Sequence, residues 1–476
     1  MRILMLSHGH PAFSIGGAEV ASYNLFNGLN GIPDVSCHYL ARVGPPIQPH
    51  RGTPFLSLRQ KERETLLFAN DYDYMRLSNR DLETLGRDFC RFVDDVNPDI
   101  VHFHHFLGFG VEAIHAVRRI RPNVPIVATL HEYLSICNNH GQMVKARTGQ
   151  LCRRASPAEC GVCFPNIPAS TLHKRELFIK TLFDEVDMFV SPSRFLIDRY
   201  VDWGIDAGRL TFLENGLEIA EVAPARPLAG GKGRRNRFAY FGQLNQFKGI
   251  KVLVEAVARV PAADWGTDSV LCVFGGNLEV QPESFQQEFK RLVQMAGRRV
   301  RFFGSYRSPD LPTLMREVDW AVVPSTWWEN SPVVIQEAFL HGRPVICSDI
   351  GGMAEKVRNR VDGLHFRAGS AESLVDRLVE VLHNPEIWDR LRTRIRRPIS
   401  AGEAAEQHLA LYRHVLDRRR HRHTVAAQTS GLPASKHQAE FGALPPGSMP
   451  APEPDQVAGS VSAAEPSAVV PTAAAA

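Results

Sequence analysis

Residues 327–352 read WWENSPVVIQEAFLHGRPVICSDIGG, and this stretch decides the fold. A short apolar run, WAVVPS, precedes it at 320–325, and a second run, RPVICSD, lies within it at 343–349. The residues between the two runs have the character of a buried helix. A strand, a helix and another strand in this order predict a parallel sheet.

The ends of that helix are marked by residues with known positional preferences. Pro332 suits the first helical position, where its missing N–H is no loss, and Ser331 can cap the helix. Gly342 suits the residue just past the C-terminus. We therefore expect a helix over about 332–341.

The start of this helix is a predicted anion site. The free N–H groups of Val333 and Val334, together with the helix dipole, would lie at the carboxyl end of a parallel strand, where open α/β sheets bind ligands. Glu329 precedes the helix and Glu337 lies one and a half turns inside it. A carboxylate beside an anion site is costly unless ligand hydroxyls donate to it, as those of a sugar and a ribose can. The alternative is a solvated Glu329 and a Glu337 that pairs with an arginine.

The same alternation of strand and helix extends outward in both directions. Apolar runs with strand character occur at 2–7, 99–105, 125–131, 188–193, 209–216, 237–244, 269–276 and 299–305. Amphipathic segments with helical period lie between them, at 18–29, 110–120, 249–260 and 370–382. The pattern predicts an α/β protein with parallel sheets that helices cover on both faces.

The alternation is interrupted once, by a segment rich in Pro, Gly and Arg that is typical of a linker. Beyond the second half, a basic helical segment is followed by Ala, Pro, Ser and Gly with few large apolar residues, which predicts disorder. We expect an N-terminal Rossmann-like domain at 1–219, a linker at 220–237 and a C-terminal Rossmann-like domain at 238–400. A helix at 401–423 would pack back on the first domain, and a disordered tail would follow at 424–476.

Composition narrows the class of protein. The 476 residues are 44% hydrophobic and carry a formal net charge of only +4, so no nucleic-acid partner is expected. No apolar run is long enough to span a membrane. The N-terminus, MRILMLSHGH, reads as a first strand rather than as a signal peptide. We therefore expect a cytoplasmic protein whose eight cysteines are reduced unless they bind a metal.

Several motifs in order resemble the family-four retaining nucleotide-sugar glycosyltransferases, which have the GT-B architecture. The E-x7-E pattern of Glu329 and Glu337 is the central one. The others are GGAE at 16–19, LHEY at 130–133, SPSRF at 191–195, ENG at 214–216, YFGQLNQFKG at 240–249 and the trailing DIGG. The resemblance covers most of residues 1–400.

The resemblance implies how the donor diphosphate is held. Gly16 and Gly17 would let the backbone approach the diphosphate and sugar, although two glycines also suit a tight turn before a helix. The family pairs an arginine with a lysine in a GR-x4-KG pattern. Lys248 matches that lysine, unless it is only a surface lysine, but Gln243 replaces the arginine and brings no charge. Arg307 or an arginine of the linker could substitute.

The resemblance also implies roles around the transferred sugar. Glu329 would contact sugar hydroxyls, Glu337 would bind the ribose, and the backbone of Asn330, Ser331, Pro332, Val333 and Val334 would hold sugar and phosphate. His131 would face the donor sugar, although a lone histidine is more often structural. The implied chemistry is front-face transfer with retention, in which the donor phosphate helps to deprotonate the acceptor and the protein supplies positioning and charge stabilisation.

Two further clusters are candidates for acceptor or metal binding. The histidines at 102, 104 and 105 could line the acceptor side of the cleft. A metal site made by the three is less favoured, because alternate residues of a strand point to opposite faces of the sheet. The second cluster consists of Cys137, Cys152, Cys160 and Cys163. A structural zinc site is one interpretation of these cysteines, and reduced thiols, a disulfide or an iron–sulfur centre are others.

The basic tract RRRHRH at 418–423 is either a solvated helix end or a site of attraction to an anionic membrane.

The function that the resemblance implies is transfer of a sugar from a UDP- or GDP-linked donor to a glycan or lipid-linked acceptor, in polysaccharide or glycolipid synthesis. No catalytic metal is expected, because Lys248 and the helix start would neutralise the diphosphate, and closure about the linker would assemble the site.

Two other functions are open at this stage. A catalytically silent nucleotide-sugar-binding protein is suggested by Gln243. A dinucleotide oxidoreductase is disfavoured because no G-x-G-x-x-G follows the first strand.

Overall fold

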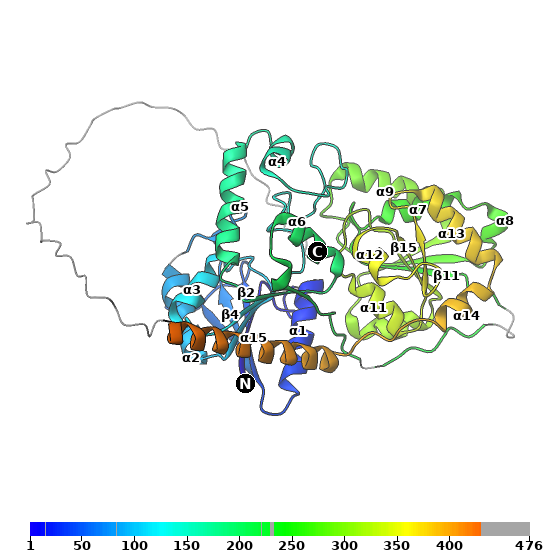
Figure 1. Cartoon of the computed structure of the whole chain (residues 1–476). Coiled ribbons are helices and arrows are strands. Elements are labelled where there is room, and N and C mark those ends of the chain that lie inside the picture. The colour runs from blue at the N-terminus through cyan, green and yellow to red at the C-terminus, as the bar shows by residue number, and fades with distance from the viewer. Residues whose placement is uncertain (15, 82, 220, 229–232, 430–476) are drawn as a thin grey trace, which may run out of the picture.

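The computed structural model describes residues 1–14, 16–81, 83–219, 221–228 and 233–429. Its body consists of two domains side by side, each built around a twisted parallel sheet with helices on both faces (Figure 1). This confirms the predicted fold class. The domains are joined by two segments of chain, and a cavity lies between them.

The N-terminal sheet has eight strands, all parallel except one edge strand. Its central strands are buried along most or all of their length, as expected of a sheet covered on both faces. Only β3 runs antiparallel, against β4. In spatial order the strands are β10 (Leu210–Phe212), β9 (Met188–Ser191), β8 (Ile126–Thr129), β7 (Ile100–Phe103), β1 (Arg2–Ser7), β2 (Ser36–Val43), β4 (Lys61–Phe68) and β3 (Phe55–Leu58).

Helices of this domain connect successive strands and cover the sheet. They are α1 (Gly17–Asn30), a π-helical turn (Thr84–Phe89) that runs into α2 (Cys90–Val96), α3 (Glu112–Ile120), α4 (Pro157–Cys163), α5 (Ala169–Phe183) and α6 (Arg194–Trp203). Two short strands, β5 (Tyr72–Asp73) and β6 (Ser78–Asn79), form a separate ribbon, and Ala207–Arg209 form a 3-10 turn.

The C-terminal sheet has six strands, all parallel, in the order β13 (Val300–Gly304), β12 (Val270–Phe274), β11 (Arg237–Phe241), β14 (Trp320–Val323), β15 (Val345–Ser348) and β16 (Gly363–Phe366). Its helices are α7 (Ile250–Arg259), α8 (Ala262–Trp265), α9 (Glu283–Ala296), α10 (Leu311–Arg316), α11 (Val333–Leu340), α12 (Gly351–Lys356), α13 (Ala371–His383) and α14 (Glu386–Arg392). Short 3-10 turns lie at Gly297–Arg299 and Ser308–Asp310.

Buried charges fix the segment that leads into the second sheet. The Asp319 carboxylate, fully buried, accepts from Arg226 and Arg235. Arg343 is equally buried and donates to five backbone carbonyls, among them those of Ala223 and Pro224. A buried charge is costly unless it is fully paired, so these two residues hold the incoming segment against the C-terminal domain.

The chain returns to the N-terminal domain through its last described helix, α15 (Ala401–Thr429). The returning segment pairs with the outgoing one, because Leu217 donates to Ile399 and Ala401 donates to Leu217. The helix then packs along α1 on the outside of the N-terminal sheet (Figure 1). It extends to Thr429 rather than to residue 423, since the first glycine and proline that follow stand at 431 and 433. The rest of the predicted tail, 430–476, lies outside the described residues.

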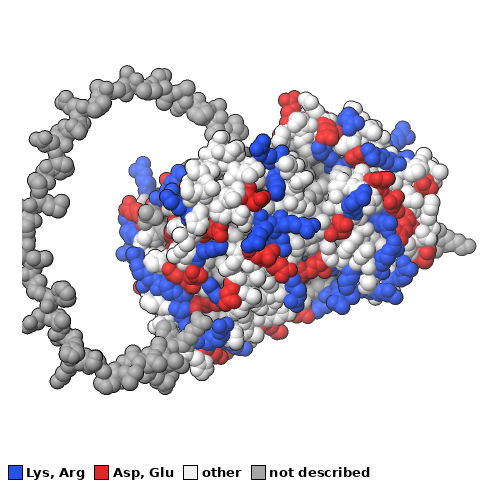
Figure 2. Space-filling model, turned by 45° about the horizontal axis from the view of Figure 1, so that its top comes forward, with Lys and Arg blue, Asp and Glu red and all other residues white. Residues whose placement is uncertain are grey.

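Acidic and basic side chains alternate over the face of the molecule in Figure 2, without one broad surface of a single sign. In the described part of the chain no helix combines the length and the apolarity needed to cross a bilayer.

Candidate functional site

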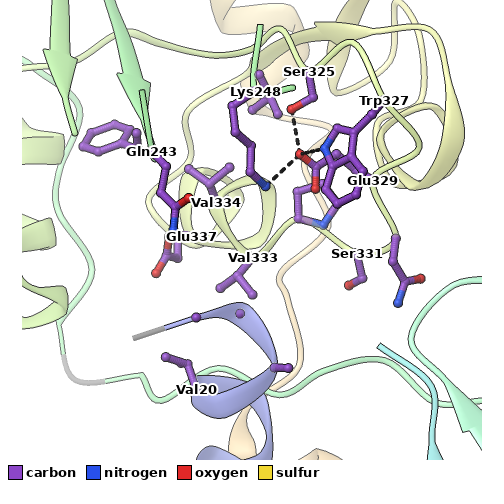
Figure 3. Close-up of a pocket in the computed structure, with 18 of the residues that line it drawn as sticks. Val20, Gln243, Lys248, Ser325, Trp327, Glu329, Ser331, Val333, Val334 and Glu337 are labelled. Carbon is purple, nitrogen blue, oxygen red and sulfur yellow. Dashed lines mark hydrogen bonds and ion pairs between the residues drawn. The ribbon is translucent and has the colours of Figure 1, made fainter. Parts of the chain in front are cut away.

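A cavity of about 260 Å³ lies where the carboxyl ends of the two sheets face each other. The N-terminal domain contributes the start of α1 and the residues after β8. The C-terminal domain contributes the ends of β11 and β14 and the first turns of α11. In Figure 3, Val20 of α1 faces Val333 of α11 across the cavity. The sequence-predicted residues of the donor site therefore come together here, from both domains.

The start of α11 differs in detail from the predicted one. The helix begins at Val333, with Pro332 in the cap position, and no side chain of the described residues caps it. The Ser331 hydroxyl donates to Glu214 instead. The prediction that Ser331 caps the helix is therefore wrong, because the helix begins one residue later than expected and Pro332, rather than Ser331, occupies the cap position. At the other end Gly342 has a φ of 66°, the left-handed conformation for which glycine is suited.

Glu329 is the most strongly held group in the cavity. It is 5% exposed, and its Oε1 accepts from Lys248 Nζ at 2.8 Å, from Ser325 Oγ at 2.7 Å and from Trp327 Nε1 at 3.0 Å (Figure 3). Burial alone would raise the pKa of this carboxyl, but the Lys248 charge and the hydrogen bonds outweigh it and hold the pKa below its ordinary value. Glu329 is thus ionised, and the three bonds occupy one oxygen and leave Oε2 as an acceptor.

Lys248 is positioned by the turn that precedes α7. Asn245 Oδ1 accepts the Lys248 N–H, and the next residue, Gly249, has a φ of 70°. An added Cβ at Gly249 would lie 1.8 Å from the Pro324 carbonyl oxygen, so only glycine allows this approach to the end of β14. Lys248 is therefore an internal ion-pair partner of Glu329, and the alternative of a plain surface lysine is wrong.

Among the described residues that line the cavity, Lys248 is the only lysine or arginine. Gln243 lies opposite it, and its Oε1 accepts from Asn245. Arg307 is exposed and pairs with Asp310 outside the cavity. The linker arginines that the structure describes bond elsewhere, Arg226 and Arg235 to Asp319, Arg234 to the Asp264 carbonyl and Arg237 to Glu317. The prediction that one of them takes the place of the missing arginine does not hold in this structure, because each is engaged in local pairing.

Glu337 points into the cavity from α11 (Figure 3). Within the described part of the chain no arginine or lysine forms an ion pair with it, so the alternative of a paired Glu337 is wrong. Burial raises the pKa of Glu337 to about 7. The carboxyl is therefore available to a ligand and titrates near neutral pH.

The N-terminal wall of the cavity includes Gly16, Gly17 and His131. Gly16 has an extended backbone, φ −132° and ψ 167°, so this position needs no left-handed turn. Burial lowers the pKa of His131 to about 3, which keeps the imidazole neutral. Its Nε2 lies 3.1 Å from Nδ1 of His104.

Asn330 joins the two domains beside the site. Its side-chain N–H groups donate to the carbonyls of Leu130 and His131, and its Oδ1 accepts from Ser193. Sequence reasoning predicted a backbone role for Asn330 and missed this side-chain contact. It also missed Trp327 and Ser325, although they lie only two and four residues before Glu329.

The predicted acceptor histidines are not in the cavity wall. His102 and His104 are buried behind His131, and His105 lies near Glu132, 3.4 Å from its carboxylate. His102 instead bonds Thr129 and Tyr412, the latter from α15. For His102 the prediction fails because α15 covers this residue, and for His104 because its ring lies behind that of His131. No local pattern in 99–105 indicates either contact.

The four cysteines of the insert after β8 are free thiols. Cys137 is buried and the other three are half-buried. In the described ranges no three Cys, His, Asp or Glu side chains are arranged to hold a metal ion. The zinc site at the four cysteines therefore stays a prediction. The insert does touch the cavity wall, because Trp328 Nε1 donates to the Cys152 carbonyl at 3.1 Å.

Comparison with known proteins adds two family matches. Residues 15–221 match the model described as Glycosyltransferase Family 4, and residues 235–384 match Glycosyl transferases group 1. The chain is 23% identical over 427 residues to a D-inositol 3-phosphate glycosyltransferase of Corynebacterium aurimucosum, which covers 86% of this chain and 91% of the relative. It is 25% identical over 415 residues to a glycogen synthase of Mycobacterium tuberculosis, covering 82% and 88%.

Solved structures agree on the fold. A sucrose-phosphate synthase of Thermosynechococcus elongatus superposes with a TM-score of 0.63 at 19% identity, over 88% of this chain and all of that one. Anabaena HepE in complex with UDP and glucose superposes with a TM-score of 0.58 at 18% identity, over 86% and 99%.

Proposed function

We propose that this chain, which belongs to the family-four glycosyltransferases and has the GT-B fold, transfers a sugar from a nucleotide diphosphate sugar to an acceptor hydroxyl. The observation that carries the proposal is Glu329, an ionised carboxylate tied to Lys248 at the start of α11 and facing the N-terminal wall. An ionised acceptor beside free helix amides suits a ligand that combines hydroxyls with phosphate.

The donor diphosphate would lie against the first turn of α11. The leading N–H groups of a helix have no acceptor within it, and they carry the positive end of the dipole. Val333 and Val334 present these groups to the cavity. Glu329 would then accept from sugar hydroxyls and Glu337 from the ribose, with UDP or GDP as the nucleotide.

We infer that the reaction retains the anomeric configuration. The bond from C1 of the sugar to the diphosphate breaks, the acceptor oxygen bonds C1 on the same face, and the acceptor proton passes to the leaving phosphate. No metal ion takes part in this scheme. The protein contributes positioning and charge stabilisation, through His131 on one side of the sugar and Glu329 on the other.

The acceptor would approach from the N-terminal domain, and we propose a glycan or a lipid-linked sugar in cytoplasmic synthesis of polysaccharide or glycolipid. Contact with the membrane surface would come from the basic end of α15. Arg419 is anchored there by Asp187 and by the Pro122 carbonyl, which fixes this end of the helix to the N-terminal domain. Basic residues near an anionic leaflet are each worth about 1 kcal/mol.

The proposal is tested with a panel of UDP- and GDP-sugars, by measuring donor binding and slow donor hydrolysis in the wild type and in Glu329→Ala. We expect hydrolysis to fall by about a hundredfold or more in a variant that still folds, as a cooperative melt shows, although its melting temperature should drop because Lys248 loses its ion-pair partner. Glu329→Gln, which keeps the volume, should behave in the same way.

Glu317→Ala is the matched control, because Glu317 lies just before β14 but is exposed, and its one ion pair among the residues that the structure describes is with Arg237. Full activity of Glu329→Ala would remove this residue from the site. Donor binding by the wild type without any turnover would instead identify a silent binding protein.

A further inference from the structure

A second histidine lies directly behind His131. His104 follows β7 and His131 follows β8, so both stand at the carboxyl edge of the N-terminal sheet on neighbouring strands. Their rings are stacked, with centroids 5.4 Å apart and an angle of 26°, and His104 Nδ1 lies 3.1 Å from His131 Nε2. His131 lines the cavity, whereas His104 is 3% exposed and does not.

Only one of these two nitrogens can carry the shared proton. Burial lowers the pKa of both imidazoles well below the ordinary value, so each ring is neutral and has one N–H. In one arrangement His131 donates from Nε2 to His104 Nδ1. In the other His104 donates from Nδ1 to His131 Nε2.

The far nitrogen of His104 distinguishes the two arrangements. His104 Nε2 is buried and has no hydrogen-bond partner among the described residues. If His131 were the donor, His104 would carry its own proton on Nε2, and a buried N–H would lack an acceptor. If His104 is the donor, Nε2 is only a bare lone pair, and folded proteins tolerate an unpaired buried acceptor better than an unpaired buried N–H.

We propose that His104 is a positioning residue that donates to His131 Nε2 and thereby holds the proton of His131 on Nδ1. His131 then meets its ligand as a hydrogen-bond donor, never as an acceptor. The role in catalysis rests on the proposed function, because it supposes that a nucleotide sugar fills the cavity. A sugar would accept from His131 on one side and donate to Glu329 on the other.

The surroundings of His104 keep it in place for this role. The ring of His102 lies 4.2 Å from that of His104, centroid to centroid. His102 is itself fixed at both nitrogens, by Thr129 Oγ1 and Tyr412 Oη, each at 2.7 Å. Because Tyr412 belongs to α15, the returning helix supports His131 through two intervening rings.

The first test is nitrogen NMR of the full chain with labelled histidine and without any ligand. The His131 signals are identified by their loss in His131→Gln. We expect Nδ1 to be the protonated nitrogen of His131 and Nε2 to be the bare one. A proton on Nε2 would overturn the proposal.

The second test compares two substitutions of His104. The Asn amide in His104→Asn can still donate from near the Nδ1 position, so donor hydrolysis should stay within about threefold of wild type. His104→Leu has no donor and no longer fixes the proton of His131 on Nδ1, so we expect about a tenfold loss in kcat/KM and a mixture of the two neutral forms of His131 in the NMR spectrum.

His408→Asn is the control, because it removes another buried imidazole of the same cluster, whose one hydrogen bond within the described residues is to the Ala404 carbonyl. Equal turnover in His104→Leu and His408→Asn, or an equal loss in His104→Asn and His104→Leu, would contradict the proposal. If His104→Leu does not fold, the proposal is still tested by the protonated nitrogen of His131 in the wild type and by donor hydrolysis in His104→Asn. If the wild type turns over no donor, the proposed function fails, yet the tautomer of His131 remains measurable.

Discussion

The charges around the cavity are unusual for a site proposed to hold a diphosphate. Lys248 is the one described cation in the cavity wall, and its charge is already paired with Glu329. Gln243 stands opposite with a neutral amide. The helix amides of α11 are then left to balance most of the phosphate charge, so we expect modest donor affinity with a weak dependence on salt.

Gln243→Arg should strengthen donor binding. A guanidinium at this position can donate to phosphate in two parallel hydrogen bonds, and a charge-assisted bond is worth about 1.5–3 kcal/mol. We expect the dissociation constant of UDP or GDP to fall roughly tenfold, and the gain to shrink as salt is raised. Calorimetric titration at two salt concentrations measures both effects.

Gln246→Arg is the matched control, because it adds the same charge at an exposed position of the same turn outside the cavity wall. An equal gain in both variants would mean that general charge, rather than the place of Gln243, governs affinity.

Glu337 should make donor binding depend on pH. Burial raises the pKa of Glu337 to about 7, so the carboxyl is largely protonated at pH 6 and ionised at pH 8. The ionised form accepts more hydrogen bonds from the ribose, and we therefore expect binding to strengthen as pH rises through 7. The ligand should be a nucleotide sugar, whose diphosphate does not titrate in this range.

Titration calorimetry at pH 6, 7 and 8 gives this dependence. His131 does not contribute to this pH dependence, since burial lowers its pKa to about 3 and the imidazole stays neutral from pH 6 to pH 8. Glu337→Gln should flatten the profile. A slope that survives in Glu337→Gln would assign it to another group.

At the scale of the element, α11 shows what a sequence can predict about a site. The strand, the proline and the two glutamates follow from local preferences, and these place Glu329 and Glu337 around one helix start. The bond between Lys248 and Glu329 does not follow, because 81 residues separate the partners. The engagement of Ser331 by Glu214 is equally non-local, so a capping preference could not anticipate it.

The first turn of α12 presses against the loop that carries Glu329. Gly352 N–H donates to the Glu329 carbonyl at 2.7 Å, and an added Cβ at Gly352 would lie 1.5 Å from the Asn330 carbonyl oxygen. Gly352→Ala must therefore displace this loop. We expect a loss of stability of about 1–3 kcal/mol and a fall in donor hydrolysis of about a hundredfold, because small displacements of reacting groups are costly.

Urea unfolding and a hydrolysis assay measure the two effects of Gly352→Ala. Gly402→Ala is the control, since the nearest atom to its added Cβ is 3.9 Å away, and alanine favours the helix there. Wild-type hydrolysis in Gly352→Ala would show that this contact does not position Glu329.

At the scale of the whole molecule, alternating strands and helices are enough to predict two parallel sheets. They do not predict how the domains meet, because contacts such as that of Asn330 with Ser193 and the His131 carbonyl depend on the relative placement of the sheets. They also do not predict that α15 reaches His102. That contact explains why His102, which was expected in the cleft, is buried.

The returning helix should therefore be essential to the N-terminal domain, while the segment after it should not. Leu409, Tyr412 and Val415 of α15 are buried against that domain, and each such side chain stabilises the fold by roughly 1.5–3 kcal/mol. A chain that ends at residue 429 should melt like the full chain. A chain that ends at residue 400 loses a large part of a total of about 5–15 kcal/mol, and we expect it to be insoluble or partly unfolded.

A third chain, ending at residue 417, separates stability from membrane contact. It keeps the three buried side chains but lacks the basic tract that follows, so it should fold with at most a small loss, from the missing bond between Arg419 and Asp187. In flotation with vesicles that contain anionic lipid, the chain ending at 429 should bind and the chain ending at 417 should not, and neither should bind neutral vesicles. Equal binding by both chains to anionic vesicles would place the membrane contact elsewhere on the molecule, and binding by neither would leave the basic tract as a solvated helix end.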